Sequence, residues 1–404
     1  MQQDGENSKK YRVLIFMVET PFLERYYKRY GIDELRELGF EVVVYDLSPY
    51  FQPIAYKKIV ANLCDYEKCG IKRVFSDREF EDSLTKYINE ETLLICSMGY
   101  KWEYRKVFRI IKKKRFDFCY FMQELSPTDG LTFKKDIKTK YSFSNIKAAI
   151  VRRIPYRLQG VGMARFIIGC GADKEAIDVF KRARLCDYNC PVFYFHSSNY
   201  DDCLKLSKEP RIIEDRYCLF IDQYLPYHTD LINSGINIEP EKYYASMNYL
   251  FEYIEKSFEM KVVIAAHPRS DLEKCKKYFS GRRLFIDKTC SLIKDADFVI
   301  YHFSNSLAYV MMFKKPILIV YTEEVYKYFQ EQIDAVCKLL SVDGLSINNF
   351  CDNDNKKEQI CNRLKIDEET YKNYIVSYMK RDYSGKIEGD CLWKQIGMFL
   401  KKYE

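Results

Sequence analysis

Several features that would place a chain in a special class are absent or scarce in this sequence. Glycine (16) and proline (11) are few among the 404 residues, and 47% of the residues are hydrophobic, which excludes a disordered or fibrous chain. No uncharged apolar run reaches the length of a membrane span. The first ten residues are polar and lack the apolar stretch of a signal peptide, so we expect a cytoplasmic protein.

Zinc-binding cysteine motifs are also missing. The sequence has 15 cysteines, but no pair of Cys-x-x-Cys units has the spacing of a zinc site. Their number is odd, and several of them, such as Cys96, Cys119 and Cys218, lie inside apolar runs. We therefore interpret them as reduced core residues, which agrees with a cytoplasmic location.

The positive charge of the chain is modest and partly local. The formal net charge is +7, and residues 134–165 place a series of lysines and arginines among Tyr, Phe, Ile and Val. A basic amphipathic segment of this kind can lie on the anionic inner face of a cell membrane, although an ordinary solvated face explains the charges equally well. No signature of a nucleic-acid-binding module accompanies the charge, so we expect no nucleic acid partner.

Apolar runs alternate with helical stretches from the start of the chain. A buried strand over residues 11–18, a helical stretch over 23–38 and a second strand over 41–47 form a βαβ unit, which predicts a parallel sheet. The same alternation predicts four further strands over residues 92–97, 116–122, 165–170 and 191–195.

A short polar stretch at residues 207–210 separates this series from a second one. Strands are expected over residues 217–222, 261–266, 284–286, 298–300 and 316–320. The sequence therefore predicts an α/β protein with two Rossmann-like, doubly wound domains that face a cleft. The expected boundaries are residues 1–210, residues 211–388 and a C-terminal helix over 389–404.

Polar residues directly follow one expected strand of the second domain. His267 and Pro268 come after the strand over 261–266, and the proline stops that strand. Ligands of doubly wound sheets bind beyond the carboxyl ends of the strands. An imidazole placed there can donate a hydrogen bond to a phosphate and act as a general acid near neutral pH. The alternative is a histidine that only caps a loop.

A second polar segment, Ser304-Asn305-Ser306, lies between the strand that begins at residue 298 and an expected helix. Small hydroxyl residues at a helix start expose backbone N–H groups and add their own donors, which suits an anion. A plain N-cap is the alternative. Because these residues and His267 follow strands of one sheet, we expect a shared phosphate site.

A third loop, which follows the strand over 217–222, borders the same crevice. Gln223 and His228 lie in this loop and are placed to touch a nucleotide or a sugar. A polar connecting loop without a binding role is the alternative.

The order of these motifs resembles the bacterial sialyltransferases and polysialyltransferases and, more loosely, the capsule Kdo transferases, which have the glycosyltransferase-B (GT-B) fold. In that family a His-Pro motif and a Ser-Ser/Thr motif hold the phosphate of a CMP-sugar. The resemblance implies that His267 binds this phosphate and assists departure of the leaving group. It implies that Ser304 and Ser306 bind the same phosphate, although Asn305 separates two serines that are usually adjacent.

The same family has an acidic pair before a glycine in its first domain, which supplies the general base for the acceptor hydroxyl. The nearest match is Asp129-Gly130, with Glu124 close by. The resemblance implies Asp129 as the base, with Glu124 second and Glu19 third. Asp-Gly is also a common turn pair, so a simple turn is the alternative.

The resemblance implies a metal-independent glycosyltransferase of the sialyltransferase-like kind. The donor would be a CMP-sugar carrying sialic acid, another nonulosonic acid or Kdo. The acceptor would be a saccharide or lipid-linked oligosaccharide hydroxyl in surface polysaccharide or lipooligosaccharide synthesis. Hydrogen bonds from His267 and the serines, with the charge of Arg269, would take the place of a divalent metal, and no cofactor is expected.

Two alternatives remain open. The first is a UDP- or GDP-sugar transferase or an epimerase on the same fold, whose diphosphate ligand calls for a larger basic site. The second is a non-catalytic, transferase-like binding protein, which the incomplete acidic motif favours.

Overall fold

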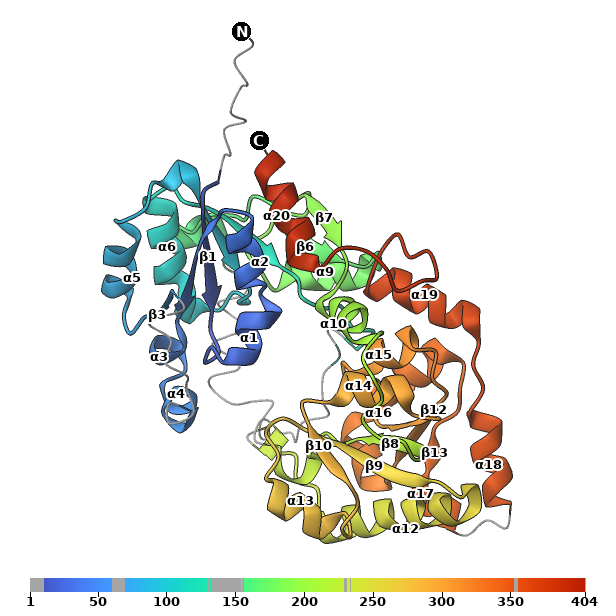
Figure 1. Cartoon of the computed structure of the whole chain (residues 1–404). Coiled ribbons are helices and arrows are strands. Elements are labelled where there is room, and N and C mark those ends of the chain that lie inside the picture. The colour runs from blue at the N-terminus through green and yellow to red at the C-terminus, as the bar shows by residue number, and fades with distance from the viewer. Residues whose placement is uncertain are drawn as a thin grey trace. The chain divides into compact units, whose positions relative to one another are not determined.

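The computed structural model describes residues 11–59, 70–128, 131, 154, 156–228, 231–232, 234–351 and 355–403. The chain divides into two compact units (Figure 1). The first comprises Met1–Leu125, Ile146–Ser198 and Gly389–Glu404. The second comprises Ser126–Asn145 and Asn199–Glu388.

The first unit is built on a seven-stranded sheet with the order β3-β2-β1-β4-β5-β6-β7, in which every paired strand is parallel. In the middle of the sheet, Ile15 lies opposite Val43 on one side and Leu94 on the other. The strands are β1 (Val13–Val18), β2 (Glu41–Asp46), β3 (Ile71–Arg73), β4 (Thr92–Cys96), β5 (Asp117–Phe121), β6 (Ile167–Cys170) and β7 (Val192–Phe195).

Helices connect these strands, as expected for βαβ crossovers. They are α1 (Glu24–Arg29), α2 (Ile32–Glu37), α3 (Ser48–Phe51), α4 (Pro53–Ile59), α5 (Asp77–Leu84), α6 (Arg105–Lys113) and α9 (Lys174–Arg182), with 3-10 turns at Asn89–Glu91, Trp102–Tyr104 and Tyr156–Gln159. The helical stretch predicted over residues 23–38 is two helices, because Gly31 between them has a left-handed φ of 54°.

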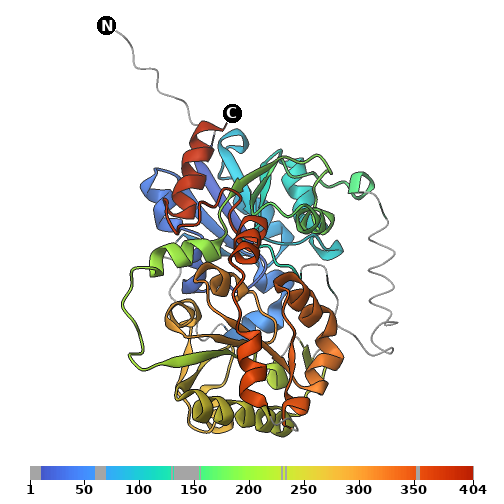
Figure 2. The same ribbon diagram turned by 90° about the vertical axis from the view of Figure 1, so that its right-hand side faces the viewer.

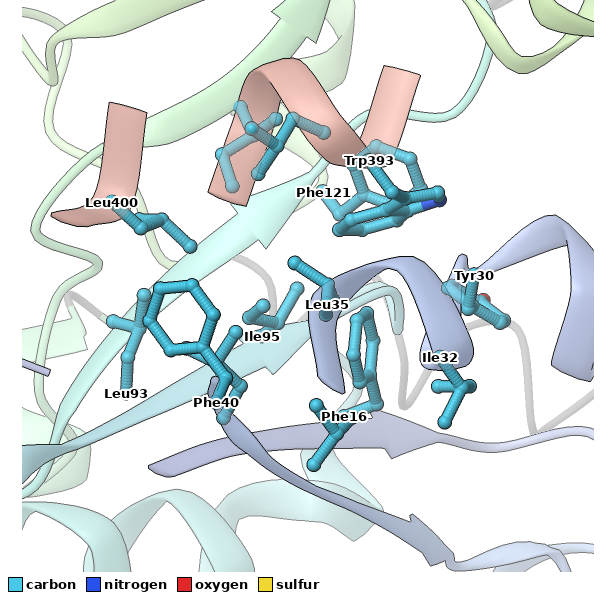
Figure 3. Packing of buried hydrophobic residues seen from close by; sticks show 14 of the residues in the cluster. Phe16, Tyr30, Ile32, Leu35, Phe40, Leu93, Ile95, Phe121, Trp393 and Leu400 are labelled. Atoms are coloured by element: carbon cyan, nitrogen blue, oxygen red, sulfur yellow. The ribbon is translucent and has the colours of Figure 1, made fainter. Parts of the chain in front are cut away.

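The C-terminal helix α20 (Leu392–Lys402) packs in the first unit, beside α2 (Figures 1 and 2). Its Trp393 lies in a cluster of buried side chains and has ring contacts with Phe16 and Phe121 (Figure 3). The indole Nε1–H donates a hydrogen bond of 2.7 Å to the carbonyl of Arg29. A Cβ atom at Gly31 would lie 2.3 Å from Trp393, so the break between α1 and α2 makes room for this helix.

The second unit is built on a six-stranded sheet with the order β10-β9-β8-β11-β12-β13, again with parallel pairs. Its strands are β8 (Tyr217–Ile221), β9 (Lys261–Ala266), β10 (Leu284–Ile286), β11 (Val299–Tyr301), β12 (Ile317–Tyr321) and β13 (Leu345–Ser346). Both sheets place the first strand in the middle and wind outward to both sides. The predicted class of two Rossmann-like, doubly wound α/β domains is therefore confirmed.

The helices from residue 198 onward are α10 (Ser198–Leu206), α12 (Pro240–Phe258), α13 (Leu272–Tyr278), α14 (Thr289–Asp295), α15 (Leu307–Met312), α16 (Glu323–Leu340), α17 (Ile347–Cys351), α18 (Lys356–Arg363) and α19 (Glu368–Tyr378), with a 3-10 turn at Leu225–Tyr227. Among the helices in the described ranges, none combines the length and the apolar character that crossing a membrane requires.

Candidate functional site

Three polar loops leave neighbouring strands at one edge of the second sheet. β8 lies between β9 and β11, and all three strands are parallel. Their carboxyl ends continue into residues 222–228, 267–271 and 302–306, respectively. These loops hold the residues singled out in the second half of the sequence. The candidate site is therefore the carboxyl edge of β9, β8 and β11, where doubly wound sheets bind their ligands.

Two histidines from different loops meet at this edge. The rings of His228 and His267 have centroids 5.0 Å apart and planes inclined by 69°. Nδ1 of His267 accepts a hydrogen bond of 3.2 Å from the backbone N–H of Arg269. The neutral imidazole of His267 therefore carries its proton on Nε2, which is the arrangement that a donor to a phosphate oxygen requires.

Pro268, Arg269 and Ser270 form the turn that follows His267. The backbone N–H of Ser270 donates to the carbonyl of His267 at 2.9 Å, and the side chains of Pro268 and Arg269 are exposed. Asp271 ends the turn and caps α13, because its carboxylate accepts from the backbone N–H of Lys274 at 3.2 Å. The turn thus fixes His267 by backbone bonds while the Arg269 side chain faces solvent.

Gln223 joins the β8 loop to the β11 loop. Its Oε1 accepts a hydrogen bond of 3.3 Å from the backbone N–H of Phe303. The ring of Phe303 stacks on Phe329 of α16 with centroids 4.4 Å apart, which holds this backbone against the core. Gln223 therefore supports the loop that carries the serine motif.

The two serines of the motif have different surroundings. The backbone of Ser304 is held by Tyr301, whose hydroxyl accepts from Ser304 N–H at 2.5 Å and donates to Ser304 C=O at 2.6 Å. The Oγ of Ser304 accepts from the backbone N–H of Ser306 at 3.2 Å. Ser306 precedes α15, but within the described residues its side chain makes no capping hydrogen bond. The plain N-cap alternative therefore does not account for the Ser306 hydroxyl.

The histidine at the start of this motif, His302, is a core residue. It is fully buried, its Nδ1–H donates to the carbonyl of Val320 at 2.6 Å, and its Nε2 accepts from the Tyr243 hydroxyl at 2.9 Å. Burial lowers the pKa of His302 to about 4, against the opposing effect of the Val320 bond. His302 is therefore neutral at physiological pH and connects β11 to β12 and α12.

One buried acidic residue at this edge was not identified from the sequence motifs. Asp222, directly after β8, is 3% exposed, and its Oδ1 accepts from the backbone N–H of Tyr224 at 2.9 Å. Its Oδ2 has no hydrogen-bond partner in the described part of the chain. Burial raises the pKa of Asp222 to about 7, although bonds from the Tyr224 and Gln223 backbone lower it. The sequence feature that could have identified Asp222 is its position directly after an apolar run that predicts a buried strand.

The three acidic candidates from the first half of the sequence have the following positions. Asp129, the first choice for the base, lies outside the described residues. Glu124 follows β5 and forms an ion pair with Arg29. Glu19 follows β1 and accepts hydrogen bonds from the Tyr104 hydroxyl and from Lys101 Nζ, the latter at 3.4 Å.

The remaining expectations are only partly covered by the structure. Most of the basic stretch over residues 134–165 lies outside the described residues, so membrane contact stays a prediction. Arg165, at its end, pairs with Asp117 at 2.6 Å. Within the described ranges, no group of three or more His, Cys, Asp or Glu side chains is arranged to hold a metal ion.

Comparison with known proteins yields structural neighbours only. No family model matches the sequence, and no curated protein matches it. The solved structure of the wall teichoic acid polymerase TagF is similar over 98% of this chain and 90% of its own, with 8% identity and a TM-score of 0.52.

Two further neighbours are less similar. A Methanocaldococcus jannaschii UDP-GlcNAc 2-epimerase matches over 96% of this chain and 99% of its own, with 12% identity and a TM-score of 0.47. Acinetobacter baumannii MurG matches over 96% and 99%, with 8% identity and a TM-score of 0.45. At these identities the likeness shows the fold alone. With the two parallel sheets, it confirms the predicted two-domain, Rossmann-like GT-B fold.

Proposed function

We propose that the protein is a glycosyltransferase that binds a nucleotide-sugar donor by its phosphate at the carboxyl edge of β9, β8 and β11. The observation that carries this proposal is the convergence of three polar loops on that edge. The contacts between His228 and His267 and between Gln223 and Phe303 link the three loops. A donor set of this kind, placed beyond parallel strands, suits a phosphate group.

The reaction needs a stabilised leaving group. As the bond between the sugar and the phosphate oxygen breaks, negative charge grows on the phosphate, and the Nε2–H of His267 is the group proposed to donate to it. Ser306 N–H orients the Ser304 hydroxyl, whose own hydrogen stays available for donation. We assign Ser304 and Ser306 as further phosphate donors, with Asn305 in the turn between them and Arg269 adding positive charge.

The acceptor hydroxyl must lose its proton as it bonds to the anomeric carbon of the sugar. We assign this proton to a carboxylate from the first half of the sequence, with Asp129 as first choice. Glu124 and Glu19 already have partners in the first unit, Arg29 for Glu124 and Tyr104 and Lys101 for Glu19. They rank below Asp129 because the resemblance places the base directly before a glycine, as Asp129 is before Gly130.

The charge at the edge favours a donor with one phosphate. The three loops contain one permanently charged cation, Arg269, beside the aspartates Asp222 and Asp271. The phosphodiester of a CMP-sugar brings one negative charge, whereas a UDP- or GDP-sugar brings two and needs more compensation. We therefore propose a CMP-activated donor with sialic acid, another nonulosonic acid or Kdo as the sugar, and an acceptor saccharide of a surface polysaccharide or lipooligosaccharide.

The test is stabilisation of the purified protein by nucleotides. Melting temperatures are measured with CMP, CDP, UMP, UDP, GDP and dTDP for the wild type, for His267→Ala and for Lys277→Ala, which removes an exposed charge at the far end of α13. We expect a selective shift with CMP that His267→Ala abolishes and Lys277→Ala retains, followed by turnover of a CMP-sugar.

The other outcomes separate the alternatives. A shift with UDP or GDP in place of CMP would retain the fold-based proposal and replace the donor, as for a UDP- or GDP-sugar transferase or an epimerase. Binding of CMP without turnover of any CMP-sugar, in a protein that Asp129→Ala leaves unchanged, would favour a non-catalytic binding protein. No shift with any nucleotide would refute binding of a nucleotide-sugar donor at this edge.

A further inference from the structure

The chain has only four histidines, and two of them are in ring contact at the candidate site. His228 comes from the loop after β8 and His267 from the loop after β9, so the contact depends on the order of the strands in the sheet. The other two, His196 and His302, lie in the first unit and in the core of the second unit, respectively.

Backbone hydrogen bonds are formed by described residues on both sides of His228. Before it, Tyr227 N–H donates to the Tyr224 carbonyl at 3.0 Å, and the Tyr227 hydroxyl is 2.7 Å from that of Tyr278 on α13. After it, the N–H groups of Leu231 and Ile232 donate to the His228 carbonyl at 3.0 and 3.1 Å. The structure therefore presents the two imidazoles together.

The number of protons bound by two neighbouring imidazoles depends on the charges around them. Each ring titrates near neutral pH in the absence of perturbation, and two positive charges at this separation repel one another. Among the described residues, the positive groups of the neighbouring segments include Arg269 on the turn and Lys274 against the Tyr227 ring. The negative groups include Asp271 at the cap of α13, the buried Asp222, and Glu241, which accepts from the Tyr278 hydroxyl at 3.3 Å. An anion within hydrogen-bond reach of both rings offsets the repulsion and favours their protonation. In His267 the added proton goes to Nδ1, which then gives up the bond that it accepts from Arg269 N–H.

We propose that His228 is a second phosphate ligand, so that His228 and His267 bind one phosphate group of the ligand together and take up a proton from solvent as it binds. The inference rests on the proposed function for the identity of the nucleotide, but it concerns the phosphate alone. It assigns a role to His228 that the His-Pro and serine motifs do not include. The ligand class is a phosphate monoester or diester with a single phosphate group.

The small number of histidines makes the test direct. In protein with isotope-labelled histidine, the ring signals of the four residues are assigned with single His→Gln variants and followed from pH 5.5 to 8.5, without ligand, with inorganic phosphate and with CMP. We expect both ligands to move the His228 and His267 signals and to keep both rings protonated to higher pH. His302 serves as the reference that does not titrate in this range, because burial lowers its pKa to about 4.

Calorimetry gives the second readout. CMP is titrated into the full chain in two buffers of different ionisation enthalpy, and the difference in heat gives the number of protons taken up. We expect net uptake by the wild type, loss of most of this uptake in His228→Gln, and an affinity for CMP that is roughly tenfold weaker in this variant. Unchanged His302 signals show that the variant is folded.

The outcomes distinguish the inference from the proposed function. If CMP binds and moves only His267, His228 is not a ligand and the proposed function stands. If inorganic phosphate moves both signals but no nucleotide binds, the two-histidine phosphate site stands and the proposed function fails. If neither phosphate nor CMP moves either signal, both are refuted.

Discussion

Replacement of Trp393 by alanine is expected to destabilise the first unit by about 4 kcal/mol. The indole is 2% exposed and contacts Phe16, Tyr30 and Phe121, with ring centroids between 4.7 and 6.3 Å apart. Large-to-small changes at such positions cost about 3–5 kcal/mol, because apolar contacts are lost and a cavity remains. Loss of the bond from Nε1 to the Arg29 carbonyl accounts for about 1 kcal/mol of this sum.

Urea unfolding followed by tryptophan fluorescence measures this loss. Both tryptophans, Trp102 and Trp393, belong to the first unit, so Trp102 remains as its reporter in the variant. With an m value of about 2 kcal/mol per M, a loss of about 4 kcal/mol lowers the midpoint by about 2 M.

Two further variants in helix α20 serve as controls. Trp393→Phe keeps an aromatic ring and loses the N–H, so we expect a loss of about 1–2 kcal/mol. Met398→Ala changes a side chain that is 43% exposed, and we expect a change within about 0.5 kcal/mol. If Trp393→Ala loses no more than Met398→Ala, α20 does not complete the first core and the packing described for it is wrong.

Three other predictions concern pH, backbone strain and membrane contact. Because burial raises the pKa of Asp222 to about 7, above its value in the unfolded chain, Asp222 disfavours the folded state increasingly as pH rises from about 4 to 7. Melting temperatures across this range should therefore fall for the wild type relative to Asp222→Asn, and parallel curves would contradict the burial of its charge. Gly31→Ala should cost about 2–4 kcal/mol in urea unfolding, since Gly31 has a left-handed φ and its Cβ would overlap Trp393, whereas Gly160→Ala, with a φ of 73° and no overlap, should cost about 1 kcal/mol. Equal losses would show that the overlap is relieved without cost. For the basic stretch over 134–165, vesicles with anionic lipid should sediment the protein at low salt and release it at high salt, and failure to sediment would end the proposal of peripheral membrane contact.

Much of the fold could be predicted because local patterns determine it. Apolar runs bounded by helical stretches predicted the strands of both sheets except β3 and β13. The alternation of strands and helices predicted parallel pairing. The edge strands β3 (Ile71–Arg73) and β13 (Leu345–Ser346) were not predicted, because each contains a single apolar residue and so gives no apolar run. A side chain at residue 31 would overlap Trp393, which is far away in sequence. The residues near position 31 therefore do not show why the helix breaks there.

The candidate site was predictable in part for the same reason. His267 and the serines follow strands directly, so their place at the carboxyl edge was readable from order alone. The contact between His228 and His267 requires that β8 and β9 be neighbours, which is a property of the whole sheet. The sequence placed His302 beside the serines, but its burial against Tyr243 and Val320 depends on α12 and β12.

The return of α20 to the first unit has a consequence for biosynthesis. Arg29 and Trp393 are joined by a hydrogen bond although 364 positions separate them, and Asn199–Glu388 of the second unit lie between them in the chain. A ribosome therefore makes the whole second unit before the helix that fills the first core emerges. We expect the second unit to reach its native packing during translation, while the first unit, which begins the chain, waits as an incomplete intermediate that chaperones can recognise by its uncovered apolar side chains.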